Sequence, residues 1–466
     1  MWLFETREDD DGLPGPERLL AVLALVSGTL MSVVDTTMIN LALPSIAADL
    51  EVASADVVWV TTIFQVVSAA FLLVFAGLSE LVTRRRIYLF GLSTFVLAAL
   101  GSALSRQLEL LLVFRALQGL GAAATLSIGA SLYRLIFPSR LLGSALGLSA
   151  LVVGGGYAAG PTLSGVMLSF THWPWLFALN VPLGVVSLLL AYRALPREAP
   201  RQGSFDVPGA LLSMLTLAGL FLTMDAIGHR APLWQWAGLG AVALAGGTAF
   251  IRRQRRAAYP LLPLYLFGER RFTLAVSASG LAFIGQGLAF VALSFLYQEK
   301  MGLSPLLTAW LFTPWPLALM VVGPLAGRLA DRVNPSVLST TGLALVIAGF
   351  VALALVDKNT GIVGSLWRVA LCGLGFGLFQ PPNNREMMAS LPAARSANVS
   401  GVMSTTRTVG QSLGVALVGA VLALGLAVQV TLWLGAVSAL LSLVVSAARI
   451  PLARRAMQAR ASSTVA

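Results

Sequence analysis

Long apolar stretches dominate this chain and restrict what it can fold into. Fourteen of them run for about 20 residues with few or no charges, which is long enough to cross a bilayer as an α-helix. They cover about residues 19–42, 54–79, 87–105, 109–132, 141–168, 174–195, 208–228, 233–251, 272–297, 305–327, 335–356, 364–386, 401–424 and 428–448. Because 57% of the 466 residues are hydrophobic and only 11% are charged, a soluble domain would not hide so much apolar surface. We therefore predict an all-α membrane protein with fourteen transmembrane helices.

Basic residues alternate between the two sides of this predicted bundle. Of the 31 lysines and arginines, 23 fall in connections on one side, 5 on the other and 3 within the spans. The positive-inside rule places the richer side, and with it both termini, in the cytoplasm. The net charge of +11 then reflects membrane topology. No basic stripe interleaved with aromatics indicates nucleic-acid binding.

Two short motifs recur eight spans apart, which indicates an internal repeat. Ala76–Glu80 is similar to Gly327–Asp331, and Gly156–Gly160 is similar to Gly410–Gly414. Two six-helix bundles with an inserted helix pair between them would give this offset, and parallel repeats of this kind are a transporter design. The predicted parts are an N-terminal tail (1–18), a first bundle (19–196), an inserted pair (197–251), a basic cytoplasmic connector (252–271), a second bundle (272–449) and a C-terminal tail (450–466).

Asp35 and Arg115 lie inside predicted spans, where an ionisable group is costly and is a functional candidate. Each stands roughly 10 Å below the same membrane surface, so the two side chains can meet. Arg115 would then keep Asp35 ionised, and withdrawal of Arg115 would leave a desolvated carboxylate that takes up a proton. The pair is therefore a candidate proton switch. A static ion pair that fixes two helices is the alternative.

Glycines concentrate in the fifth span, between residues 143 and 165. Gly156 and Gly160 share one helical face, where small residues let two backbones approach closely in lipid. Pro161 removes a backbone donor and favours a bend. We predict a helix that bends and lets a neighbour slide past it, as a gate requires. Ordinary helix packing is the alternative.

Charged turns after spans two and ten are candidates for a conformational latch, because partly exposed ion pairs can break and re-form. Their members are Glu80, Arg84, Arg85, Arg328, Asp331 and Arg332. Topogenic charge alone would account for the arginines but not for the acids. Arg385, Glu386 and Arg407 are predicted to form interhelical or inner-gate ion pairs. Asp225 joins this group, with a solvated helix-end residue as its alternative.

Signals for a substrate cavity are weak, because most aromatics in membrane helices face lipid or neighbouring helices. A cavity wall combines apolar surface with a few polar groups. The candidates are Phe64, Gln65, Gln118, Phe283, Gln286, Gln298, Phe290 and Trp310. No Gly-x-x-x-x-Gly-Lys-Ser/Thr run is present, so an ion gradient or the substrate's own gradient is expected to supply energy. The two histidines, His172 and His229, are far apart, and neither a metal nor a cofactor is expected.

Several of these stretches together resemble the major facilitator superfamily, and within it the fourteen-helix drug:proton antiporters, over nearly the whole chain. They are Asp35–Pro44 (DTTMINLALP), Ala76–Arg86, Arg115–Gly119 (RALQG), Gly160-Pro161 and Trp173–Gly184 (WPWLFALNVPLG). The resemblance implies a major facilitator fold and proton-driven export of amphipathic, often cationic, compounds across a bacterial inner membrane. In that family the glycine–proline stretch of span five marks antiporters as opposed to symporters.

The chain departs from the family pattern in both charged turns. The first carries Glu80-Leu81 where an aspartate and a basic residue are usual, and Thr83 where glycine is usual. Threonine does not readily take the positive φ that glycine adopts, so the geometry of this turn is not determined by the resemblance. The second turn has Asn334-Pro335 in place of glycine and a basic residue.

Span thirteen contains Arg407 and Gln411 but no acid, whereas some relatives carry an acid there that assists with cationic drugs, so dicationic substrates are not expected. The prediction is a monomeric proton-coupled antiporter that moves small amphipathic compounds through the lipid bilayer. An exporter or importer of one metabolite is the first alternative. A membrane enzyme or a non-transporting sensor is the second, and it would need a clustered catalytic constellation or a sizeable soluble domain.

Overall fold

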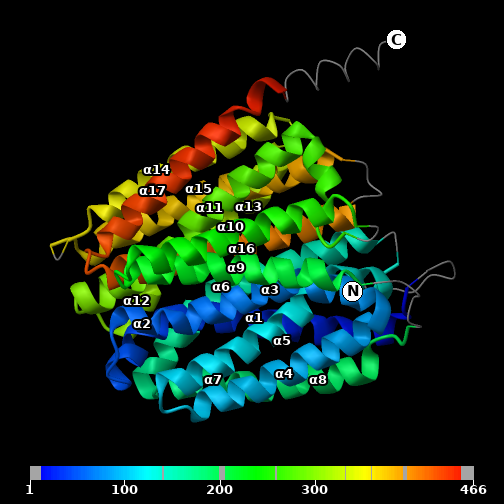
Figure 1. Cartoon of the computed structure of the whole chain (residues 1–466), viewed down its shortest axis with the longest axis horizontal. Helices are drawn as coiled ribbons and strands as arrows, with labels where there is room; N and C mark the ends of the chain where they lie inside the picture. The colour runs from blue at the N-terminus through cyan, green and yellow to red at the C-terminus, as the bar shows by residue number, and fades with distance from the viewer. Residues whose placement is uncertain are drawn as a thin grey trace. The chain divides into compact units, whose positions relative to one another are not determined.

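Helices account for all regular structure in the part of the chain that the computed structural model describes, residues 12–138, 141–198, 205–257, 260–330, 332–357, 359–391 and 396–452 (Figure 1). The chain divides into two units. Unit 1 runs from Met1 to Leu262 and unit 2 from Pro263 to Ala466.

Unit 1 holds the helices that carry Asp35 and Arg115. Its elements are α1 (Gly15–Asp49), α2 (Ser54–Val57), α3 (Trp59–Val82), α4 (Arg84–Leu104), α5 (Leu108–Ile136), α6 (Leu142–Phe170), α7 (Pro174–Ala178), α8 (Asn180–Ala194), α9 (Val207–Gly228) and α10 (Leu233–Gln254). α1 packs on α6, α8 and α5, while α5 lies between α3 and α4. α4 also contacts α8, and α9 packs on α3 and α10.

Unit 2 repeats the pairings of the first eight helices. Its elements are η3 (Leu264–Gly268), α11 (Arg270–Phe295), η4 (Leu296–Lys300), α12 (Pro305–Phe312), α13 (Pro314–Leu329), α14 (Pro335–Ala354), α15 (Ile362–Ala389), α16 (Ser396–Ala423) and α17 (Gln429–Ala447). α11 packs on α16 and α17, α15 lies between α13 and α14, and α14 contacts α17. Helices α1, α3, α4, α5, α6 and α8 of unit 1 therefore correspond to α11, α13, α14, α15, α16 and α17.

Glycines fix the register of this correspondence. A Cβ atom on Gly119 of α5 would clash with the carbonyl of Phe64 on α3, and one on Gly373 of α15 would clash with the carbonyl of Trp315 on α13. Both contacts bring two helix backbones together at a point where no larger residue fits. The two glycines therefore occupy the same place in the two units.

Thirteen helical segments of the described chain are long and apolar enough to cross a membrane. They include every predicted span except the eighth. That span is present as α10, a helix of 22 residues, but two tryptophans and a glutamine near its start and two arginines at its end make it less apolar than the others. The protein is thus an all-helical membrane protein, and helix length and composition alone support thirteen crossings among the described residues.

Three predicted spans are interrupted at a single residue: Val58 before α3, Leu179 before α8 and Thr313 before α13. Each of these residues keeps right-handed helical φ and ψ, so only the helical hydrogen bonding is interrupted. Pro314 directly follows the third break and Pro182 closely follows the second, and proline lacks the N–H that continues a helix.

Thr83, the residue between α3 and α4, has a φ of 104°. The left-handed region favours glycine, and a β-branched residue is rare there. The expectation that threonine avoids this conformation is therefore wrong: the turn keeps the shape of a glycine turn in spite of its side chain. The Thr83 hydroxyl accepts a hydrogen bond from the Arg86 N–H at 3.4 Å. Such a residue stores on the order of 1–3 kcal/mol of backbone strain.

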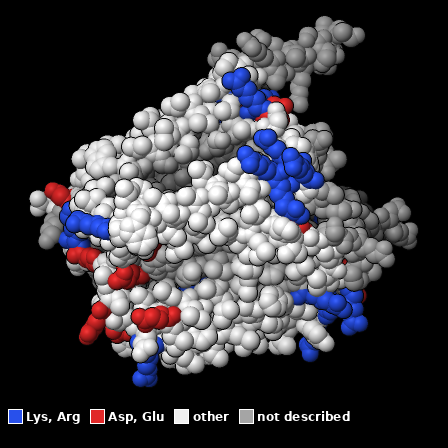
Figure 2. All heavy atoms as spheres, in the orientation of Figure 1, with Lys and Arg blue, Asp and Glu red and all other residues white. Residues whose placement is uncertain are grey.

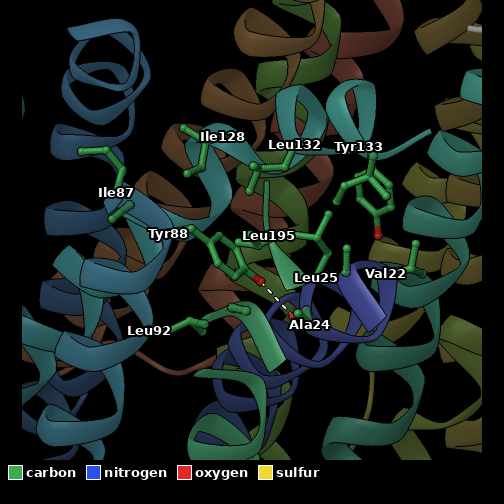
Figure 3. Close-up of a cluster of buried hydrophobic side chains, with 14 of the residues drawn as sticks. Val22, Ala24, Leu25, Ile87, Tyr88, Leu92, Ile128, Leu132, Tyr133 and Leu195 are labelled. Atoms are coloured by element: carbon green, nitrogen blue, oxygen red, sulfur yellow. Dashed lines mark hydrogen bonds between the residues drawn. The ribbon is translucent and has the colours of Figure 1, made fainter. Parts of the chain in front are cut away.

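An apolar cluster fills unit 1 where α4 begins and α5 ends (Figure 3). Ile87 and Tyr88 of α4 meet Leu132 of α5 and Leu195 at the end of α8. The Tyr88 hydroxyl donates a hydrogen bond to the carbonyl of Ala24 at 3.0 Å, which satisfies the one polar group of that side chain. This end of the unit is therefore held together by apolar packing.

Candidate functional site

A buried ion pair joins α1 to α5. Arg115 Nη1 lies 2.7 Å from Asp35 Oδ2, and neither side chain is exposed. Arg115 Nε also donates to the carbonyl of Val60 on α3 at 3.0 Å. A buried charge is costly unless it is paired and hydrogen-bonded, so each partner depends on the other. The structure brings together the two residues that the sequence indicates as a proton switch.

Polar side chains from α4, α5 and α8 surround this pair. Asn180, the first residue of α8, donates through Nδ2 to Asp35 Oδ1 at 2.8 Å. Gln118 Oε1 accepts from Arg115 Nη1 at 2.9 Å and from Ser102 Oγ at 3.2 Å. The sequence assigns Gln118 to a substrate cavity, whereas the structure places its side chain against Arg115.

Aromatic rings cover the guanidinium. Arg115 Cζ lies 4.3 Å from the ring centroid of Phe64 and 5.5 Å from that of Phe177, within the range of a cation–π interaction. Phe64, also predicted to line a cavity, is thus part of the ion-pair site. Arg115 Nη2 is buried and has no hydrogen-bond partner among the described residues. An unmet buried donor costs about 1–3 kcal/mol, so the arginine is not bound as tightly as it could be.

The chemistry of this site depends on where Arg115 lies. While the arginine is in place, Asp35 accepts a charge-assisted bond from Arg115 and amide bonds from Asn180 at 2.8 Å and Gln118 at 3.5 Å. Such donors bind a charged carboxylate more strongly than a neutral one. If Arg115 moves away, the carboxylate is left desolvated and without a counter-charge, and protonation becomes the less costly state. The arrangement thus supplies the groups that the predicted proton switch requires.

The glycine-rich helix α6 packs next to this site. A Cβ atom on Gly160 would clash with Thr37 of α1, and one on Gly156 would lie 2.9 Å from Val33 Cγ1. In contrast, Gly154 has no neighbouring atom within 4 Å of such a position. Close packing against α1 accounts for Gly156 and Gly160. α6 continues through Pro161 as one helix from Leu142 to Phe170.

Unit 2 contains a different buried cluster, centred on Glu386 of α15. Arg449 Nη1 lies 3.1 Å from Glu386 Oε2 and Arg271 Nη2 lies 3.3 Å from Oε1. The Ser336 hydroxyl donates to the same carboxylate at 2.8 Å, and Asn383 Oδ1 accepts from Arg449 at 2.7 Å. Two arginines therefore share one carboxylate. Of the other predicted interhelical charges, Arg385 is exposed and Arg407 is partly buried.

Asp225 links α9 to α3, because its Oδ1 accepts a hydrogen bond from Trp59 Nε1 at 2.7 Å. His229 lies 3.3 Å from Asp225 Oδ1 and 3.3 Å from Asp56 Oδ1. Partial burial disfavours a charged His229, but its hydrogen bonds and charge interactions with the two aspartates outweigh burial and raise the pKa of the imidazole above its usual value.

The arginines of the first charged turn contact α8 and the residues that follow it. Arg84 forms an ion pair with Glu198, and Arg85 Nη2 donates to the carbonyl of Tyr192 at 2.6 Å. Acidic side chains of unit 1 gather at the end of the unit where α2 lies (Figure 2). Most of its basic side chains lie toward the other end of the unit. The two arginines thus anchor α4 to α8 at the basic end.

The acids of the predicted latch fall outside the described part of the chain. This holds for the side chain of Glu80 and for the whole of Asp331. Arg328 and Arg332 are both exposed. The latch therefore stays a prediction.

The other cavity candidates lie in separate surroundings. Gln286 Oε1 accepts a hydrogen bond from Gln411 Nε2 at 2.8 Å, between α11 and α16. The ring centroids of Phe290 and Trp315 lie 5.1 Å apart. Trp310 is 57% exposed. Of the remaining three, Gln65 and Phe283 are buried and Gln298 is partly buried.

Sequence reasoning missed Asn180, Arg271 and Arg449. Asn180 is a polar residue in an apolar span and forms part of the WPWLFALNVPLG stretch. Its polarity at this position was a signal that the sequence offered. The two arginines stand at span ends, where positive charge is ordinary, so nothing in the sequence set them apart.

Known proteins with similar sequences are membrane transporters. The Major Facilitator Superfamily family model matches residues 25–415. The chain is 41% identical over 414 residues to the uncharacterized transporter YebQ of Escherichia coli, covering 88% of this chain and 91% of that protein. It is 32% identical over 407 residues to the multidrug efflux pump LfrA of Mycolicibacterium smegmatis, covering 86% and 80%.

Two further likenesses bear on function and fold. The chain is 27% identical over 402 residues to the riboflavin transporter RibZ of Clostridioides difficile, covering 86% of this chain and 87% of that protein. The crystal structure of a POT family transporter in complex with a thioalcohol-conjugated peptide matches with a TM-score of 0.70 at 13% identity, covering 94% of this chain and 96% of that one. At this identity the second likeness concerns the fold alone.

Proposed function

Because the chain belongs to the major facilitator superfamily, and so is a multi-pass membrane transporter and not an enzyme, we propose that it is a proton-coupled antiporter. It exports amphipathic, mainly cationic, organic compounds by alternating access. The observation that carries this proposal is the Asp35–Arg115 pair, a buried carboxylate whose counter-charge, the one found among the described residues, comes from another helix. The multidrug efflux pump among its relatives supports the substrate class.

Coupling follows from the two charge states of Asp35. Proton uptake neutralises the carboxylate and releases Arg115 from its partner, and proton loss restores the pair. If the transporter changes access only when Asp35 is deprotonated with substrate bound, or protonated with substrate absent, proton entry drives substrate exit.

We further propose fourteen transmembrane helices with both termini in the cytoplasm of a bacterial cell, and a monomer in the inner membrane. The uneven division of basic residues, 23 against 5, supports this topology. α10 would cross as the partner of α9, on which it packs. A reporter protein that is active only in the cytoplasm should then be active when it is fused after residue 466.

Flux in reconstituted vesicles tests the function. Wild-type protein should drive ethidium against its gradient when an inward proton gradient is imposed, and should release protons when ethidium is added. Asp35→Asn should abolish both while inserting normally. Proton release by Asp35→Asn at the wild-type level would contradict the proposal, and so would efflux that ignores the proton gradient.

Transport of one metabolite, inward or outward, is the second candidate. The neutral Gln286–Gln411 pair, which stands where an acid would favour cations, and the riboflavin transporter among the relatives support it. Riboflavin flux measured in both directions in the same vesicles separates the two, because a drug exporter should move ethidium faster than the neutral flavin.

A further inference from the structure

Asn180 connects the candidate proton site to a helix break. Its Nδ2 donates to Asp35 Oδ1 at 2.8 Å and to the carbonyl of Leu176 on α7 at 3.3 Å. The side chain is buried, so water does not compete for either bond. One amide group therefore ties the carboxylate of α1 to the backbone that precedes the break.

The local sequence explains why this side chain is needed. Pro182 has no N–H for the carbonyl of Ala178, one turn earlier, so the helix is weakened here. Leu179, between α7 and α8, keeps helical φ and ψ of −59° and −33°, so the backbone stays in a helical conformation across the break. A side-chain bond to a carbonyl one turn back, as Asn180 makes, competes with the helical hydrogen bond and favours a bend at such a point.

We propose that Asn180 is a positioning residue for proton exchange at Asp35, and that it transmits the charge state of Asp35 to the α7–α8 break. This inference rests on the proposed function, in which Asp35 carries the proton. Asn180 holds Oδ1 while Arg115 holds Oδ2, so the two donors orient the carboxylate. A neutral carboxyl group accepts a hydrogen bond more weakly than a carboxylate. Protonation of Asp35 therefore weakens its hydrogen bond from Asn180, and the Leu176 carbonyl becomes the main acceptor for the Asn180 amide.

The electrostatic surroundings leave few other groups to set the proton affinity of Asp35. Among the described residues, Arg115 is the one charged side chain in contact with it. Neither α6 nor α7 contains Asp, Glu, Lys, Arg or His. Arg193 of α8 lies roughly 20 Å along the helix from Asn180. From α3 the site receives the neutral carbonyl of Val60. Two neutral amides donate to Asp35 Oδ1, Asn180 at 2.8 Å and Gln118 at 3.5 Å, so Asn180 makes the shorter of the two bonds.

The test is a pH titration of the protein in vesicles by infrared spectroscopy, following the carboxyl band that Asp35→Asn removes. Asn180→Leu replaces the amide with an apolar group of similar volume. Loss of a donor to a carboxylate favours the protonated form, so the midpoint should move to higher pH by about one unit. Asn180→Ala should move it in the same direction.

Ser187→Ala is the matched control. Ser187 is buried on the same helix and donates to the carbonyl of Ala24 on α1 at 3.0 Å, so its loss removes an α1–α8 bond without touching Asp35. The control should keep the wild-type midpoint. A shift as large in Ser187→Ala as in Asn180→Leu would overturn the inference, because it would show a general effect of loosened packing.

Hydrogen exchange of the wild-type protein supplies a readout that needs no variant. Backbone amides of α7 and of the first turn of α8 should change their protection with the same pH midpoint as the Asp35 band. Protection that ignores pH would overturn the inference, whatever the fate of the variants. If Asp35→Asn keeps proton-coupled efflux, the proposed function itself fails. If Asp35→Asn loses it but both Asn180 variants titrate like wild type, only the role of Asn180 fails.

Discussion

The buried Asp35–Arg115 pair of unit 1 and the buried Glu386–Arg449 pair of unit 2 lie at opposite ends of corresponding helices. Arg115 stands one helical turn before Gly119 of α5, and Val369 stands one turn before Gly373 of α15. Val369 is buried and apolar, so unit 2 has no counterpart of the arginine. The buried pairing of an arginine with Asp35 is therefore specific to unit 1.

Aromatic packing fills the corresponding region of unit 2. Trp315 occupies the place of Phe64, and its ring lies 5.1 Å from Phe290 and 5.4 Å from Phe376. Cys372, fully buried, takes the place of Gln118 and packs against Gly349. Ring pairs of this kind add about 0.5–1.5 kcal/mol each beyond their burial. Aromatic rings pack this region of unit 2, whereas unit 1 holds a buried ion pair there.

At the other ends of the same helices, the buried ion pair belongs to unit 2 and the corresponding position of unit 1 is apolar. Glu386 stands as far beyond Gly373 as Leu132 stands beyond Gly119. Leu132 belongs to the apolar cluster of unit 1, whereas Glu386 is bound by two arginines. A carboxylate with one cation can trade it for a proton, but neutralising a carboxylate that compensates two cations leaves both uncompensated. The number of cations for each buried acid thus distinguishes a switch from a fixed joint.

The largest effect should come from Glu386→Gln. It leaves the buried Arg449 without a counter-charge, and breaking a buried pair from one side costs about 3–5 kcal/mol. Asp35→Asn should cost clearly less, because the transport cycle itself requires a neutral group there. Unfolding of the two purified variants in detergent measures the difference. Equal losses would remove the distinction between switch and joint.

Alanine at Gly119 or Gly373 should be the next most harmful change. Each Cβ would meet a backbone carbonyl of the neighbouring helix, and overpacking of this kind costs about 1–3 kcal/mol. Similar losses in both variants would support the correspondence of the units. Gly154→Ala is the control: its side chain meets open space, so stability and efflux should be unchanged. Loss of efflux in that variant would instead favour the predicted hinge in α6.

The turns before α4 and α14 should respond in opposite directions to glycine. Thr83→Gly relieves a strained positive φ and should stabilise the protein by about 1 kcal/mol. Asn334 has a φ of −53° and its side chain accepts from the Ser336 N–H at 3.0 Å. Asn334→Gly should therefore destabilise by a few tenths of a kcal/mol. The two thermal midpoints in detergent check this, and a loss in Thr83→Gly would show that the turn is unstrained.

The smallest effect concerns pH. Both histidines belong to unit 1, and the pKa of His229 is raised by Asp225 and Asp56. A raised pKa means that the stabilisation is complete below the pKa of the unfolded chain, near 6.5, and is lost as pH rises through the higher folded value. His229 is 46% exposed, so the effect should stay below about 1 kcal/mol. His229→Gln should flatten the dependence of the unfolding midpoint on pH above about 6.5.

Local patterns in the sequence were enough to predict the helices and the meeting of Asp35 with Arg115. Apolar length determines where a membrane helix lies, and equal depth in two spans suffices to predict that their side chains can meet. α10 marks the limit of this reasoning, because its tryptophans and arginines make its hydropathy ambiguous.

The partners of the charged groups could not be predicted in the same way. Asn180 lies 145 positions from Asp35, and no periodicity specifies such a contact. Arg449 resembles any other topogenic arginine until α15 and α17 are brought together around Glu386. The conformation of Thr83 was misjudged because propensity argues against it, while the turn between α3 and α4 enforces it.

The burial of Cys372 has a practical consequence for labelling. It is the one cysteine of the chain, and its thiol is buried beside Gly349 of α14. A water-borne maleimide should therefore leave the unmodified protein unlabelled. Maleimide labelling of cysteines introduced one at a time would then report the accessibility of each position, because Cys372 adds no signal of its own. The native cysteine would not need to be replaced first.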